Sequence, residues 1–126
     1  MQSYLLKKSN FIFNSFWRKH SGMAKSFKMA CPVARTLDAV GERWTLLILR
    51  DLFLFGPRRF RDFEKSLKGM APNTLSARIK GLEGQGVIAK RFYSEHPPRA
   101  EYYLTDKGEA LGPVLLALKD WGESFG

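Results

Sequence analysis

Two short segments, residues 59–67 and 72–85, each carry one narrow apolar stripe at helical spacing, and only four residues separate them. The stripes are Phe60, Phe63 and Leu67 in the first segment and Leu75, Ile79 and Leu82 in the second. The connection contains Gly69, and Pro72 suits the first turn of the helix that follows. This pattern predicts a helix-turn-helix.

Two further helices are predicted before this pair. Residues 33–40 form a short segment that ends at Gly41, a residue typical of helix ends. Residues 43–55 are apolar on nearly every side, which indicates a central helix buried all round. The Gly-Pro pair at 56–57 ends that helix.

A β-hairpin is predicted after the pair. Residues 87–95 and 100–105 are rich in β-branched and aromatic side chains, and they flank a turn of four residues at 96–99. The two prolines of that turn cost no ladder hydrogen bond at the tip. The fold class is therefore mainly α with a small β-hairpin.

The C-terminal residues predict a last helix with an unpartnered apolar face. Thr105 is suited to cap it, and Gly112-Pro113 should kink or split it. Its apolar residues exceed what one thin domain can cover, which favours a homodimer. The expected dimer interface is Leu111, Val114, Leu115, Leu118 and Trp121.

The 126 residues carry a formal net charge of +9, which points to a polyanionic partner. Residues 56–100 hold ten basic and four acidic residues, so the helix pair and the hairpin share much of the excess. One cysteine and two histidines cannot build a disulfide framework or a Cys/His zinc site within one chain. We expect no metal and no cofactor.

Residues 1–30 contain six basic residues and no acid. We interpret them as a basic, disordered extension before a folded domain of residues 31–126. A mitochondrial-type presequence and an over-long start, with Met23 or Met29 as the first residue, remain open. No apolar run approaches the roughly 20 residues of a membrane span, so we expect no membrane partner.

The 72–85 helix carries residue types suited to reading DNA on the sides away from its apolar stripe. Amides and hydroxyls read base edges, a methyl group meets thymine, and basic groups reach guanine or phosphate. The candidates are Asn73, Thr74, Ser76, Ala77, Arg78 and Lys80. An ordinary solvated face is the alternative, but Glu83 is the single acid on this helix.

Basic residues elsewhere extend this candidate surface. Lys90, Arg91, His96 and Arg99 lie on the predicted hairpin, and an arginine at a thin tip suits the minor groove. Arg58 and Arg59 stand at the start of the first helix of the pair, where a nearby phosphate would offset their conflict with the helix dipole. Plain surface solvation is the alternative for both groups.

Several motifs together resemble the HxlR-type, MarR-like winged helix-turn-helix regulators of bacteria. They are Cys31-Pro32, GERWTLLILR at 41–50, GPRRF at 56–60, LSARIKGLE at 75–83 and PPRAEYYLTDKG at 97–108. The resemblance implies a winged helix-turn-helix with N- and C-terminal dimerisation helices, recognition residues within 72–82 and a wing at 96–99. It also implies a homodimeric transcriptional regulator. Two copies would present two recognition helices about one DNA turn apart, so we expect a palindromic operator. We expect the protein to be a cytoplasmic, nucleoid-associated repressor. Ala71 departs from the Ser or Thr usual in the family, which deprives the recognition helix of an N-cap.

Cys31 allows two interpretations. It is a small buried packing residue, or it is a redox sensor like the cysteine that several relatives carry at this position. A small-molecule or oxidant effector is accordingly a possible partner. The sequence contains no Walker loop, HExxH motif or Ser-centred glycine elbow, so we expect no enzyme. A nonspecific nucleic-acid-binding winged helix is the remaining alternative.

Overall fold

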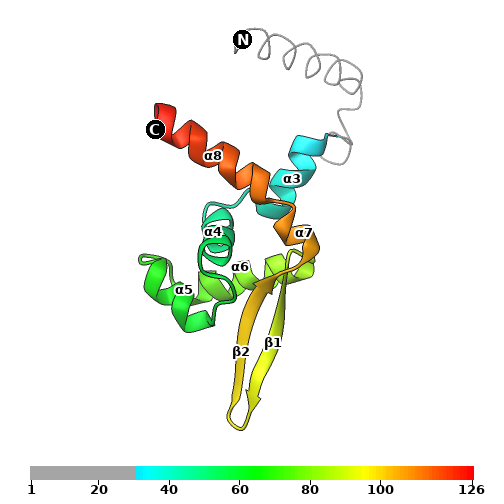
Figure 1. Ribbon diagram of the computed structural model, residues 1–126, viewed down its shortest axis with the longest axis vertical. Coiled ribbons are helices and arrows are strands. Elements are labelled where there is room, and N and C mark those ends of the chain that lie inside the picture. Colours follow the sequence, from blue (N-terminus) through cyan, green and yellow to red (C-terminus); the bar gives the residue numbers. More distant parts are fainter. Residues whose placement is uncertain (1–30) are drawn as a thin grey trace. The chain divides into compact units, whose positions relative to one another are not determined.

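A computed structural model describes residues 31–126 (Figure 1), so the interpretation of residues 1–30 lies outside the described part. Residues 31–38 belong to one compact unit and Ala39–Gly126 form another. The elements are α3 (Pro32–Val40), α4 (Thr45–Phe55), α5 (Phe60–Ser66), α6 (Pro72–Gly84), β1 (Ile88–Glu95), β2 (Pro98–Leu104), α7 (Asp106–Glu109) and α8 (Gly112–Phe125). The predicted fold class is confirmed. No helix among the described residues is long and apolar enough to cross a membrane.

One apolar core holds the second unit together. Helix α4 contributes Ile48, Leu49 and Leu52, and the base of the hairpin adds Val87 and Ile88. The stripes predicted for the helix pair are largely buried in this core, with Phe63, Leu67, Leu75, Ile79 and Leu82 almost inaccessible to water. The helix-turn-helix is thus fixed by burial of the two stripes, which leaves the opposite side of α6 free.

The prediction that residues 43–55 are buried all round is wrong for the last turn of α4. Phe53, Leu54 and Phe55 are exposed, and Leu54 retains 66% of its accessible surface. One side of α4 packs into the core, while the opposite side lies next to α8 and is only partly covered. The apolar side chains at the end of α4 therefore lie on the surface of the unit.

The hairpin is confirmed, but its turn is shorter than predicted. Strand β2 begins at Pro98, so Pro98 and Arg99 lie in the ladder opposite Glu95 and Ser94. An irregularity between Phe92 and Ser94 shifts the register, which brings these two residues into pairing. Proline is tolerated at the first residue of a strand. Figure 1 shows the hairpin projecting away from α4, α5 and α6.

The predicted cap and break after the hairpin are both present. The Thr105 hydroxyl accepts a hydrogen bond from the Gly108 amide at 3.2 Å, which caps α7. A separate helix, α8, begins at Gly112. A side chain at Gly108 would place its Cβ 2.1 Å from the Val87 carbonyl oxygen, so glycine lets α7 close against the hairpin base.

A buried carboxylate links α4 to α5. Asp51 is 1% exposed and accepts hydrogen bonds from the Ser66 hydroxyl and from Nη2 of Arg50, the latter at 3.1 Å. Nη2 of Arg58 lies 4.0 Å from the same carboxylate. Burial of a charge is costly unless hydrogen bonds and opposite charges surround it. These partners supply that compensation.

We expect Asp51→Ala to lower the free energy of unfolding by about 3–5 kcal/mol, because it leaves Ser66 and Arg58 without their buried partner. Urea denaturation measures the change. Asp120→Ala is the matched control, since Asp120 is an exposed carboxylate on α8 whose loss should change stability by less than about 0.5 kcal/mol. Equal effects of the two substitutions would contradict a structural role for Asp51.

Candidate nucleic-acid interface

Helix α6 separates a buried face from an exposed one. Leu75, Ile79 and Leu82 anchor it in the core. Asn73, Ala77 and Lys80 lie on the exposed side, whereas Thr74, Ser76 and Arg78 are half-buried on the flanks. This is the arrangement that the spacing of the stripe predicts at 100° per residue. The helix therefore presents an amide, a methyl group and an ammonium group to an approaching ligand.

The start of α6 has no side-chain cap. Ala71 occupies the N-cap position with an extended backbone (φ −67°, ψ 144°), and Pro72 follows in the first turn. The backbone conformation is thus already that of a capped helix, but the methyl group of Ala71 cannot accept a hydrogen bond. Free amides at a helix N-terminus favour anions.

Arg78 is tied to another part of the fold. Its Nε lies 3.4 Å from a carboxylate oxygen of Glu42, and its side chain is 40% exposed. Glu42 stands in the loop before α4, where its carboxylate also accepts a hydrogen bond from the Trp44 amide at 2.8 Å. Sequence reasoning missed Glu42, because an ion pair between residues 36 positions apart leaves no local pattern.

Arg58 and Arg59 differ in their environments. Arg58 is 18% exposed, donates to the Asp62 carbonyl oxygen at 3.1 Å, and lies 4.4 Å from the Phe55 ring centre. Its guanidinium group is therefore committed largely to the fold. Arg59 is more exposed, and its side chain pairs with the Asp62 carboxylate at 3.4 Å.

Asp62 resolves the conflict between these arginines and the dipole of α5. Its carboxylate accepts a hydrogen bond from the Arg59 amide at 2.9 Å, which is the half of a capping box in which the third helical residue reaches back to the N-cap. This backbone hydrogen bond, followed by the Arg59 side chain, lowers the pKa of Asp62. The dipole conflict is thus offset within the protein and gives no separate indication of a phosphate.

The basic residues of the hairpin are all exposed. They are Lys90, Arg91, His96 and Arg99. Arg91 forms an ion pair with Glu101 across the strands at 2.7 Å, while Lys90 lies 5.3 Å from the Phe92 ring centre. His96 and Arg99 stand at the tip end. Phe92 and Tyr93 on the same hairpin are also exposed, because the hairpin extends beyond the helices.

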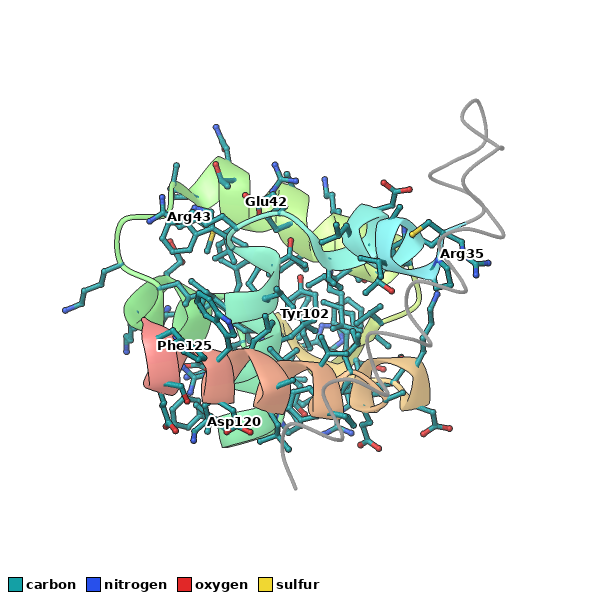
Figure 2. The ribbon with its side chains drawn as sticks, turned by 90° about the horizontal axis from the view of Figure 1, so that it is seen from above. Arg35, Glu42, Arg43, Tyr102, Asp120 and Phe125 are labelled. Atoms are coloured by element: carbon teal, nitrogen blue, oxygen red, sulfur yellow. The ribbon has the colours of Figure 1, made fainter. Side chains whose placement is uncertain are left out.

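The predicted dimer residues divide into two groups. Leu111 and Leu115 pack against the core, whereas Val114, Leu118 and Trp121 are exposed, Trp121 at 65%. Beside them, a groove of about 710 Å³ lies between α4 and α8, with Leu46, Leu54 and Leu116 among its lining residues. Figure 2 shows α8 along this side of the unit, with Asp120 and Phe125 near its end. A large apolar surface is thus exposed among residues 31–126.

Residues 39–126, which form the second unit, match a known family model. That model is described as an HxlR-like helix-turn-helix. The chain belongs to the HxlR-like family. Its resemblance to these regulators, inferred from the motifs, is confirmed.

Relatives of this HxlR-like chain are transcriptional regulators. It is 40% identical over 95 residues to the HTH-type transcriptional regulator YdeP of Bacillus subtilis, which covers 75% of this chain and 73% of YdeP. The redox regulator HypR in its oxidised form is 33% identical, with a TM-score of 0.71 over 76% of this chain and 98% of HypR. The reduced regulator YodB from B. subtilis is 30% identical, with a TM-score of 0.65 over 75% of this chain and 93% of YodB.

Cys31 is buried, as its interpretation as a small packing residue expects. Buried thiols are generally less reactive than exposed thiolates near positive charge. The redox description of HypR and the reduced form of YodB apply to those two proteins. A sensor role for Cys31 in this HxlR-like chain stays a prediction.

We expect Ala71→Ser to raise the free energy of unfolding by about 1 kcal/mol, because a hydroxyl at this extended position can cap α6 without moving the backbone. Urea denaturation of the variant and the unchanged protein measures the difference. Ala77→Ser is the control, since serine inside a helix lowers its stability slightly. A loss of stability on Ala71→Ser would show that the backbone at this position is not poised for a cap.

Proposed function

We propose that this HxlR-like transcriptional regulator binds a specific double-stranded DNA sequence through α6 and the hairpin. The observation that carries the proposal is the two-sided character of α6, which buries one stripe and exposes Asn73, Ala77 and Lys80. In this proposal the exposed face enters the major groove and reads base edges. The hairpin tip, with His96 and Arg99, contacts the minor groove.

The intramolecular pairs divide the candidate residues by role. Lys80, His96 and Arg99 are exposed and supply contacts to bases or phosphates. Arg58 supports the interface from within the fold, since its guanidinium group is bound to Asp62 and packs on Phe55. Phosphate contacts fix the register of a protein on DNA, and base contacts select the sequence. We further propose that the bound protein acts as a repressor, by obstructing transcription at its site.

Sequence-specific binding predicts distinct effects for two substitutions. The preferred duplex is first identified by selecting bound DNA from a random library. Asn73→Ala should weaken binding to this selected duplex by about 1–3 kcal/mol and should relax the preference at one base pair. Lys65→Ala is the control, because it removes an exposed charge from the last turn of α5 and should preserve the base preference. Fluorescence anisotropy against the selected and a scrambled duplex measures both.

The salt dependence separates this proposal from its alternative. A specific regulator should prefer the selected duplex over the scrambled one at every salt concentration. Steep salt dependence with equal affinity for both duplexes would instead identify a nonspecific nucleic-acid-binding protein. If the unchanged protein bound neither duplex, neither function would hold.

We also propose that two copies assemble through α8 and the groove beside it. Val114, Leu118 and Trp121 are exposed apolar residues on α8, and the groove offers a further apolar surface. Isolated domains rarely leave so much contiguous apolar area in water. A two-fold dimer would set two copies of α6 about 34 Å apart and favour a palindromic operator.

Trp121→Glu tests the interface, because it places a charge where we propose that apolar surfaces meet. We expect the dissociation constant of the dimer to rise by at least about 30-fold, as for a central tryptophan hot spot. Analytical ultracentrifugation at micromolar concentration measures it. Asp120→Ala, the neighbouring control, should leave the dimer intact. Sedimentation of the unchanged protein as a monomer would refute the assembly.

A further inference from the structure

The Glu42 carboxylate contacts both the start of α4 and the flank of α6. One of its oxygens accepts hydrogen bonds from the Trp44 amide at 2.8 Å and the Thr45 hydroxyl at 3.3 Å. The same oxygen lies 3.4 Å from Nε of Arg78. The carboxylate of Glu42 is therefore held against the start of α4 as well as beside Arg78.

Arg78 stands between the buried stripe and the exposed face of α6. Its Nε is inaccessible to water and forms no hydrogen bond among the described residues, so its contact with the Glu42 carboxylate at 3.4 Å is an ion pair. The side chain as a whole is 40% exposed. The exposed surface therefore belongs to other atoms of the side chain. A guanidinium group has five donors in a rigid fork, so a contact at Nε leaves the terminal nitrogens available for a second partner.

We propose that Glu42 is a positioning residue for DNA binding, which holds Arg78 so that its terminal nitrogens donate to a phosphate beside α6. This inference rests on the proposed function. A free arginine side chain loses rotamer freedom when it binds, and that loss weakens the complex. Contact with Glu42 orders the side chain before DNA arrives, which removes part of this cost.

Removal of the Glu42 charge should change the affinity for DNA in the direction opposite to that expected from electrostatic repulsion alone. A carboxylate near a DNA-binding helix repels phosphates, so removal of its charge should tighten binding if Glu42 has no other role. If Glu42 positions Arg78, removal of its charge should weaken binding. The direction of the change therefore distinguishes the two roles.

Glu42→Gln is the informative variant, because the glutamine oxygen can still accept a hydrogen bond from the Trp44 amide. We expect binding to the selected duplex to weaken by about two- to twelve-fold, the cost of ordering one long side chain. Glu64→Gln removes the same charge from the exposed side of α5, and should leave affinity unchanged or slightly tighter. Anisotropy titration at one fixed salt concentration measures all three proteins.

A double-variant cycle identifies the partner through which Glu42 acts. In an Arg78→Ala background, Glu42→Gln should no longer weaken binding, because the side chain that it positions is absent. Weakening by the same factor in that background would overturn the proposal, since Glu42 would then act through α4 instead. Tighter or unchanged binding of the single variant would also overturn it.

Arg78→Lys provides an independent test should Glu42→Gln prevent folding. Lysine keeps the charge but has one nitrogen to share between the Glu42 carboxylate and a phosphate, so binding should weaken by a similar factor. Full affinity in this variant would overturn the proposal. If the unchanged protein shows no duplex preference, the proposed function itself fails. A preserved preference together with unaltered binding by Glu42→Gln would remove the positioning role alone.

Discussion

The buried carboxylate of Asp51 sets the arrangement on which the rest of the unit depends. It joins α4 to the end of α5 through Ser66, and it lies near the guanidinium group of Arg58. The backbone of Arg58 pairs in turn with Tyr102 on β2, with hydrogen bonds of 3.0 and 2.7 Å. One costly buried charge thus fixes α4, α5 and the base of the hairpin together. Since α6 packs on α4 and α5, its direction follows from the same contacts.

Intramolecular pairing reduces the positive charge that is free to meet DNA. Ten basic residues in residues 56–100 suggest a strong, diffuse attraction. Yet Arg58, Arg78 and Arg91 each face a carboxylate within the fold, at 4.0, 3.4 and 2.7 Å. Charges held in this way orient donors more than they raise the surface potential. Selectivity in such an interface comes from placed side chains, and net charge supplies mainly nonspecific affinity.

Local patterns predicted most of the fold, because each helix or strand depends on spacing within a few residues. The stripes of α5 and α6, the Thr105 cap and the break at Gly112 all follow from such patterns. The exposed end of α4 did not, because burial depends on which neighbours cover each side. The ladder position of Arg99 depends on a strand irregularity that alternation cannot reveal. The candidate site was predicted by residue type, and the pairing of Arg78 with Glu42 required the fold.

The recognition helix is held by its neighbours more than by its own sequence. Ala71 supplies no cap, and Gly81 and Gly84 lower the intrinsic stability of α6, although a Cβ at either position would meet no other atom. Burial of Leu75, Ile79 and Leu82 and the contact of Arg78 with Glu42 offset this weakness from two sides. A helix stabilised in this way is sensitive to the surroundings of α4. A change in the loop at Glu42 can therefore alter the presentation of the reading face without touching any residue on it.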